Sequence, residues 1–184
     1  MARFTPVDPD EPPAAALLAE MAAELNALYR TSHRLDLPPV HSSELRPPDG
    51  IYLAGWEGDQ AVAGGAFRRL DDDLAEIKRM FVRPAARSRG VAGELLAALE
   101  DAARHRGYHR LRLDTGPKQV HALALYRREG YVPIQPYNEN PFASFWGEKE
   151  IDHDRPPPGV VAPSRAPGHR HVGREDRPPR PSVQ

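Results

Sequence analysis

The chain has no cysteine, and this absence excludes several kinds of site. Disulfides, thiolate zinc centres and a cysteine nucleophile cannot occur. No apolar run approaches the ~20 residues that a membrane helix needs. The formal net charge is only −1, so no global basic field favours nucleic acid. The first residues, MARFTPVDPDEPP, are acidic and rich in proline, unlike a signal peptide. We therefore expect a cytoplasmic protein with neither a membrane nor a nucleic-acid partner.

Aromatic residues are missing from the C-terminal segment, residues 152–184. That segment contains eight prolines and six arginines. Such a composition cannot bury enough apolar surface to offset the entropy lost on ordering, so we predict a disordered tail. Its histidines, His153, His169 and His171, could bind a metal, but a solvated tail without a rigid element is the better interpretation, and we expect no metal site. The folded domain is then expected to span residues 1–151.

The apolar spacing in residues 1–151 predicts a mixed α/β domain. A helix is expected over 14–30, where Leu17, Met21, Leu25 and Leu28 share one face. Strands are expected at 3–5, in two runs between 50 and 70, and at 74–82, 108–115, 131–134 and 144–151. Helices around 95–103 and over 118–129 should end at Gly107 and Gly130. The strand–helix–strand run in the middle implies one parallel pair in an otherwise antiparallel sheet.

The stretch VRPAARSRGVAGELLAALE, residues 82–100, combines positive charge with bare backbone before a helix. A helix start presents unpaired N–H groups and the positive end of the helix dipole. Gly90, Ala92 and Gly93 keep side chains away from those donors, and Arg87 and Arg89 add charge. The pattern favours a phosphate or pyrophosphate site. A glycine-rich turn with solvated arginines is the alternative, and neither the Walker loop nor the G-x-G-x-x-G pattern is present.

Two motifs in register resemble the GNAT family of N-acetyltransferases. Arg87-x-x-Gly90-x-Ala92 resembles its acetyl-CoA signature, [RQ]-x-x-G-x-[GA]. About thirty residues later, QVHALALYRREGY resembles its next element, N-x-x-A-x-x-x-Y-x-x-x-G-[FY], with Gln119 in the place of the usual asparagine. The resemblance covers roughly residues 2–151. It implies a mostly antiparallel central sheet, a splayed parallel strand pair and helices on both faces.

The resemblance also implies how acetyl-CoA would bind. Its pantetheine arm would lie between the splayed strands, pair with the backbone of Phe81 and Val82 and contact Gln119. The N–H of Val82 would polarise the thioester carbonyl, as an oxyanion hole does. The pyrophosphate would contact backbone N–H groups along the turn and the first residues of the helix, namely Arg87, Ser88, Arg89, Gly90, Val91, Ala92 and Gly93.

Tyr126 and Glu76 are the candidate catalytic residues. By resemblance, Tyr126 occupies the position of the acid that protonates the leaving thiolate. A phenol of pKa ~10 can protonate a thiolate whose thiol has a pKa of ~8.5. The alternative is a core aromatic residue on the helix. Glu76 lies where some family members carry a base glutamate, although a structural or surface carboxylate fits the sequence equally well. Without cysteine, direct transfer in a ternary complex is expected.

The acceptor is expected to be a small-molecule amine. The first helix, the loop after it and the last hairpin usually form the acceptor wall in this family. Here they include Glu20, Glu24, Tyr29, the loop through His41 and the stretch PYNENPFASFW. Glu20 and Glu24 could attract a cationic amine, but a solvated helix face is the simpler interpretation, and turn chemistry accounts for Tyr137, Asn138 and Asn140. A non-catalytic acyl-CoA-binding or regulatory module stays as the alternative function, and a homodimer is left open.

The predicted tail leads to a direct test. Deleting residues 153–184 should change the melting temperature by less than about 2 °C and leave acetyl-CoA affinity unaltered, because such a segment adds no buried core. Thermal unfolding of both forms, with and without acetyl-CoA, measures this. A melting temperature lowered by several degrees would show that the tail packs on the domain.

Overall fold

A computed structural model describes residues 2–30 and 40–151 of the chain. The predicted tail 152–184 and part of the predicted loop, 31–39, lie outside these residues, so the domain boundary at 151 stays a prediction. Within them, seven strands form one sheet with three helices, plus short 3-10 turns at Ser42–Leu45 and Pro84–Ala86. The elements are β1 (Arg3–Pro6), α1 (Ala14–Tyr29), β2 (Ile51–Glu57), β3 (Gln60–Arg69), β4 (Leu74–Val82), α2 (Val91–Arg104), β5 (Arg110–Thr115), α3 (Val120–Arg128), β6 (Val132–Pro133) and β7 (Phe145–Glu150).

The strand order across the sheet is β1-β2-β3-β4-β5-β7-β6. Every neighbouring pair is antiparallel except β4 and β5. This confirms the predicted mixed sheet with one internal parallel pair, because the β4–α2–β5 connection is a crossover. The predicted elements are all present, although β6 is reduced to two exposed residues.

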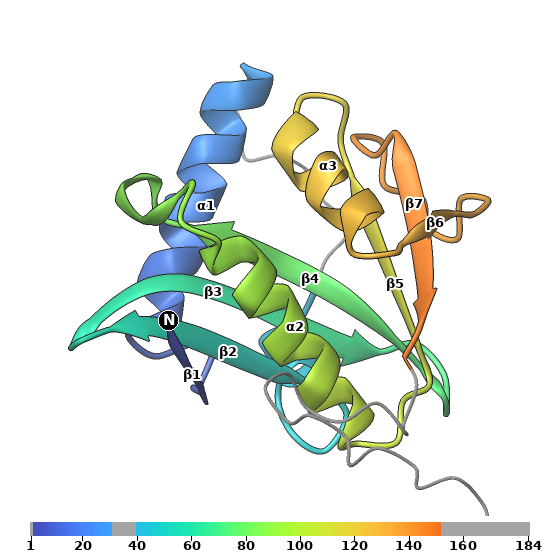
Figure 1. Cartoon of the computed structure of the whole chain (residues 1–184), viewed down its shortest axis with the longest axis horizontal. Helices are drawn as coiled ribbons and strands as arrows, with labels where there is room; N and C mark the ends of the chain where they lie inside the picture. The colour runs from blue at the N-terminus through green and yellow to red at the C-terminus, as the bar shows by residue number, and fades with distance from the viewer. Residues whose placement is uncertain (1, 31–39, 152–184) are drawn as a thin grey trace, which may run out of the picture.

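Both faces of the sheet are covered by helices, as predicted (Figure 1). On one face, Leu95, Leu96 and Leu99 of α2 form the main core with sheet residues such as Phe67 and Ile77. Helix α3 joins the same core through Leu125 and Tyr126, which are buried. On the other face, α1 packs through Ala14, Leu17 and Met21 against the sheet. Alternation along the strands directs successive side chains to the two cores.

The parallel pair β4–β5 is short. Only Leu74, Ala75 and Glu76 are paired with β5, opposite Arg110, Leu111 and Arg112. β4 then continues to Val82 and β5 to Thr115 without pairing to each other. The two strands therefore splay beyond Glu76, and this opening positions the candidate site. No helix among the described residues is long and apolar enough to cross a bilayer.

Candidate active site

A groove of about 700 Å³ runs along the splayed part of β4. Met80, Phe81 and Val82 of β4 line it, as do residues of the turn before α2. Helices α1 and α3 supply its two walls. Its volume is within the range of ~300–1,000 Å³ typical of ligand sites. Every residue that the sequence assigned to the cofactor lines it, except Arg89: Phe81, Val82, Arg87, Ser88, Gly90, Val91, Ala92, Gly93 and Gln119.

The turn before α2 is shaped by two residues in left-handed conformation, Ser88 (φ 61°) and Gly90 (φ 86°). Gly90 occupies the N-cap position, and no side chain caps the helix. Among the described residues, the N–H of Arg87 bonds to the Pro84 carbonyl and that of Gly93 to the Gly90 carbonyl. Of the backbone N–H groups predicted to contact the pyrophosphate, those of Arg87 and Gly93 are therefore already bonded within the protein, which leaves those from Ser88 to Ala92, at the positive end of the helix dipole, as the candidate donors.

The arginines of this turn are paired with carboxylates. Both oxygens of Glu24 accept from Arg87 Nη2, at 2.8 and 2.6 Å, and Arg87 Nε donates to the Val82 carbonyl at 2.8 Å. Arg89 bonds to Glu57, outside the groove. Glu20 likewise pairs with Arg83 of the same segment. Glu20 and Glu24 therefore bind arginines of the candidate phosphate loop, whereas the sequence had left them as a solvated face or an attraction for an amine.

The strand register shows which way the backbone of Val82 faces. Val82 opposes Ala63, and the neighbouring Arg83 N–H bonds to the Val62 carbonyl at 2.8 Å. Because bonded and non-bonded pairs alternate in an antiparallel ladder, the polar groups of Val82 point away from β3. They face the opening between β4 and β5. The backbone of Val82 is thus directed towards the groove, as the resemblance implied, although its carbonyl already accepts a hydrogen bond from Arg87 Nε.

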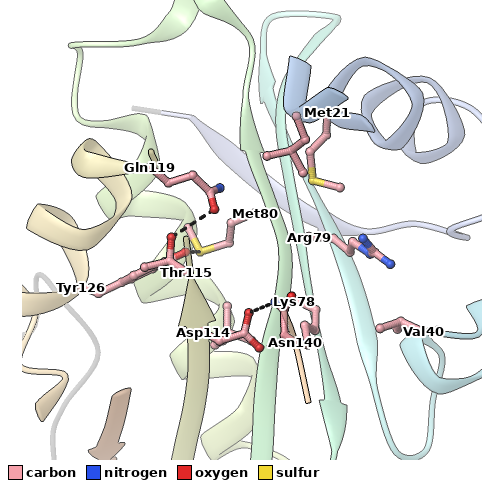
Figure 2. Close-up of a pocket in the computed structure, with 12 residues that line it drawn as sticks. Met21, Val40, Lys78, Arg79, Met80, Asp114, Thr115, Gln119, Tyr126 and Asn140 are labelled. Atoms are coloured by element: carbon pink, nitrogen blue, oxygen red, sulfur yellow. Dashed lines mark hydrogen bonds and ion pairs between the residues drawn. The ribbon is translucent and has the colours of Figure 1, made fainter. Parts of the chain in front are cut away.

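A second cavity of about 110 Å³ adjoins the groove at the fork of the two strands. The groove and this cavity, which we call the chamber, share Leu25, Met80, Gln119 and Tyr126. Figure 2 shows the chamber with Tyr126 and Gln119 on one side and Met21, Arg79 and Val40 on the other. The rest of its lining is Ile77, Lys78, Asp114, Thr115 and Asn140.

Tyr126 lies at the junction of the two cavities. Its hydroxyl donates to Met80 Sδ at 3.7 Å, a weak acceptor, and its ring packs edge-on against Tyr131. Burial and then the charge of Asp114 raise the pKa of Tyr126. The hydroxyl therefore keeps its proton over the physiological pH range, and the residue lines both the groove and the chamber.

Glu76 is fully buried and lines neither cavity. One of its oxygens accepts from Arg68 Nε at 2.7 Å. The other accepts from Tyr137 at 2.8 Å and Asn138 at 3.2 Å, and Lys78 Nζ lies 2.8 Å away. The carboxylate is thus enclosed by two cations and two neutral donors. This geometry favours the structural role that the sequence had left open beside that of a base.

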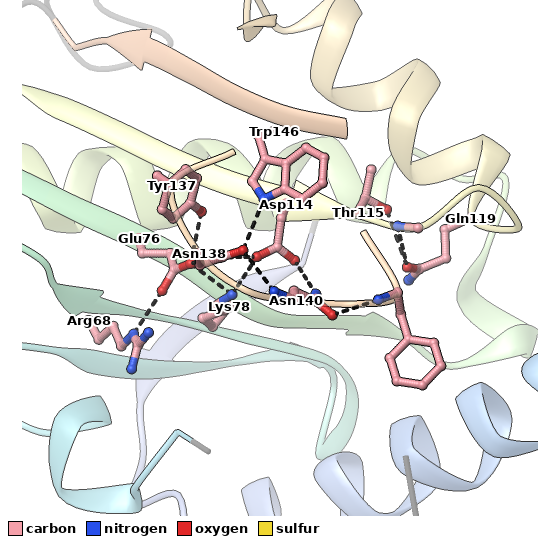
Figure 3. A network of polar contacts seen from close by, with 12 residues as sticks. Arg68, Glu76, Lys78, Asp114, Thr115, Gln119, Tyr137, Asn138, Asn140 and Trp146 are labelled. Carbon is pink, nitrogen blue, oxygen red and sulfur yellow. Dashed lines mark hydrogen bonds and ion pairs between the residues drawn. The ribbon is translucent and has the colours of Figure 1, made fainter. Parts of the chain in front are cut away.

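Asp114 is the carboxylate that lines the chamber. It accepts from Lys78 at 2.8 Å, from Asn138 at 2.6 Å and from Asn140 at 2.9 Å (Figure 3). Burial alone would raise the pKa of Asp114, but the charge of Lys78 and these hydrogen bonds outweigh it and hold the pKa below its usual range. Asp114 is therefore ionised at neutral pH.

The loop before β7 completes this network. The sequence analysis did not predict that this loop contacts Glu76 and Asp114. Asn138 donates to both Glu76 and Asp114 and accepts from Trp146 Nε1 at 2.9 Å. Turn chemistry is present, since the N–H groups of Asn140 and Phe142 bond to the side-chain oxygens of Asn138 and Asn140 at 3.3 and 3.1 Å. In addition, Tyr137, Asn138 and Asn140 donate to the carboxylates of Glu76 and Asp114. A sequence signal did exist: Glu76 and Lys78 are charged residues two apart in β4, on one face of a strand whose other residues, apart from Arg79, are apolar.

The family model described as the Acetyltransferase (GNAT) family matches residues 16–131. The chain belongs to the GNAT family. It is 35% identical over 135 residues to a protein named IAA acetyltransferase from Azospirillum brasilense, covering 70% of this chain and 85% of that one. This confirms the resemblance seen in the two motifs.

Solved structures agree. A putative acyl-CoA N-acyltransferase from Klebsiella pneumoniae is 33% identical, with a TM-score of 0.65 over 83% of this chain and 99% of that chain. A GNAT acetyltransferase from Elizabethkingia anophelis, solved with acetyl-CoA bound, has a TM-score of 0.57 at 19% identity over 82% of this chain and 98% of that one. The latter similarity supports the fold. Within the described residues, no group of three or more metal-ligating side chains occurs.

The buried network gives a stability test. Glu76→Gln should lower the free energy of unfolding by about 3 kcal/mol, because it removes a buried charge between Arg68 and Lys78. Glu44→Gln is the matched control: Glu44 pairs with the same arginine, but its side chain is 34% exposed, so the loss should stay below about 1 kcal/mol. Urea unfolding measures both. Equal losses would mean that the network does not stabilise the fork.

Proposed function

We propose that this protein transfers an acetyl group from acetyl-CoA directly to a small primary amine in a ternary complex. The observation that carries the proposal is the meeting of the groove and the chamber at Met80 and Tyr126. The donor enters from one side and the acceptor from the other. A non-catalytic acyl-CoA-binding module would not need a second cavity beside Met80 and Tyr126, where the thioester of the proposed donor would lie.

The residues of the groove fit the parts of acetyl-CoA. The uncapped N–H groups from Ser88 to Ala92 suit a pyrophosphate. The groove-facing backbone of Val82 suits the amides of the pantetheine arm. Gln119, whose side-chain oxygen accepts from the Gly116 N–H at 3.1 Å, lies at the thioester end beside Tyr126.

Met80 is the next position on β4 whose backbone faces the opening, because Phe81 is paired with Gly64 of β3. Met80 lines both cavities, whereas Val82 lines only the groove. We therefore assign the contact with the thioester oxygen to the N–H of Met80 and leave Val82 to the arm. This donor would stabilise charge that develops on the oxygen during attack.

In the transfer step, the lone pair of the neutral amine attacks the thioester carbonyl carbon. The C–N bond forms, the C–S bond breaks, and the electron pair of that bond goes to sulfur. Tyr126 gives its proton to the sulfur and regains one from the nitrogen, so the products are the N-acetylated amine and the free thiol of CoA. The buried site also raises the basicity of the thiolate, which offsets the raised pKa of Tyr126.

Glu76 is assigned a positioning role, since its carboxylate is enclosed and does not line the chamber. The amine must lose its ammonium proton to water before attack. The rate should therefore rise with pH until the amine is neutral. Tyr126, with its raised pKa, should impose no loss of rate in that range.

A substitution at Gly90 tests the anion site. Gly90→Asp should raise the acetyl-CoA Kd at least about tenfold above that of Gly90→Asn, because the added carboxylate faces the pyrophosphate. The two side chains have nearly the same shape, and both tolerate the left-handed backbone of this position. A Cβ here would meet open space. Calorimetry gives both constants, and equal affinities would remove the turn from the cofactor site.

Tyr126→Phe tests the acid. The variant keeps the ring and its packing, so we expect kcat to fall by ~10²-fold or less while the acetyl-CoA Kd changes little. Steady-state kinetics by thiol release, together with calorimetry, separates the two effects. Turnover at the wild-type rate would make Tyr126 a packing residue of α3 and refute its catalytic assignment.

A further inference from the structure

The side chain of Arg87 forms a bridge between β4 and α1 in the groove. Its Nε donates to the Val82 carbonyl at 2.8 Å, and its Nη2 donates to both carboxylate oxygens of Glu24, at 2.8 and 2.6 Å. The guanidinium carbon lies 5.7 Å from the centre of the Phe81 ring. All four residues line the groove. In Figure 1, the segment between β4 and α2 lies beside α1, which brings together two charges that are 63 positions apart in sequence.

This bridge uses groups that the proposed cofactor needs. The Val82 carbonyl faces the opening between β4 and β5, where the pantetheine arm would bond to it, and Arg87 Nε already donates to it. The guanidinium, which would attract the pyrophosphate, is paired with Glu24 instead. Glu24 also adds a negative charge to the lining of a groove that must accept an anion. Each contact of the bridge therefore opposes the binding of acetyl-CoA.

The bridge is also weak enough for a ligand to open. The side chains of Arg87 and Glu24 are 42% and 45% exposed, and ion pairs between such solvated groups add little stability. A ligand that binds only the open form has an apparent affinity reduced by the fraction of protein in that form. The strength of the bridge therefore sets part of the affinity of the groove, although it adds little to the stability of the fold.

We infer that Glu24 lowers the affinity of this protein for acetyl-CoA by holding Arg87 away from the pyrophosphate. The inference rests on the proposed acetyl-CoA site. When the cofactor binds, Arg87 exchanges Glu24 and the Val82 carbonyl for the pyrophosphate. Glu24 is thus a positioning residue that acts through Arg87. Because Arg87 belongs to the turn before α2 and not to the thioester end, Glu24 weakens the binding of acetyl-CoA and of the product CoA alike.

Two substitutions at Glu24 test the inference in the full-length chain. Glu24→Gln removes the charge and keeps the size of the side chain, and Glu24→Ala removes the whole contact without disfavouring the helix. In both variants, we expect the Kd of acetyl-CoA to fall at least about fivefold at low ionic strength, since the bridge and the repulsion of the phosphates are both lost. The Kd of CoA should fall by the same factor. Calorimetry measures both constants, and the gain should shrink at about 1 M salt, where the screening length is only ~3 Å.

Glu20→Gln is the matched control. Glu20 lies one turn earlier on α1, its carboxylate pairs with Arg83 at 2.6 Å, and its side chain is 42% exposed. Glu20 lines neither cavity. The control thus removes the same charge from the same helix outside the groove, and its Kd for acetyl-CoA should stay within about twofold of the wild-type value. Without ligand, the melting temperature should change by less than about 2 °C in all three variants.

Each outcome decides one claim. Weaker or unchanged binding of acetyl-CoA in both Glu24 variants would overturn the inference, because Glu24 would then orient Arg87 for the ligand or take no part in binding. An equal gain in Glu20→Gln would overturn it too, since any carboxylate of α1 would have the same effect. A gain for acetyl-CoA without one for CoA would place the effect at the thioester and contradict it. If neither the wild type nor the variants bind acetyl-CoA, the proposed function itself fails, whereas binding without a gain refutes only the role of Glu24.

Discussion

The early end of the pairing between β4 and β5 is the constraint on which the rest of the site depends. Three residue pairs join the two strands, and beyond Glu76 each strand stays paired only with its neighbour on the other side, β4 with β3 and β5 with β7. Backbone groups that would have bonded within the sheet are then available to a ligand, and an extended arm can bond to β4 much as another strand would. The groove, the chamber and the position of Tyr126 all follow from this separation.

The fork is filled by polar groups, which is unusual in a protein core. Glu76 and Asp114 come from the two diverging strands, and Lys78 bridges them with 2.8 Å contacts to each. Buried ions are costly unless their partners are complete. Here the network is completed by Arg68, Tyr137, Asn138 and Asn140. Closing the gap between β4 and β5 would break these contacts and leave buried charges without partners. A satisfied network of this kind therefore specifies one geometry rather than simply adding stability.

The sequence predicted the fold well because the fold depends on local patterns. Apolar periodicity predicted α1 and α2, and the alternation in RLRLDT predicted β5. The anion site that the glycine turn suggests stays a prediction. The network could not be predicted in the same way. Asn138 is separated in sequence from Glu76 by 62 residues and from Asp114 by 24. The stretch PYNEN has the composition of a turn, and nothing in it indicates that its side chains also donate to distant carboxylates. The bulge that sets Arg79 and Met80 opposite Gly65 could not be predicted either, since it follows from the register of β3 against β4.

Helix α1 connects the two halves of the site. Glu20 and Glu24 tie it to Arg83 and Arg87 of the segment that leads into the anion site, while Leu25 lines both cavities. In the proposed function, a bound pyrophosphate would give Arg87 a second anion beside Glu24 and would weaken the ion pair between them. Any shift of α1 that results also moves Met21 and Leu25, the apolar wall of the chamber. One helix therefore contributes to the walls of both cavities, through Glu24, Leu25 and Leu28 in the groove and through Met21 and Leu25 in the chamber.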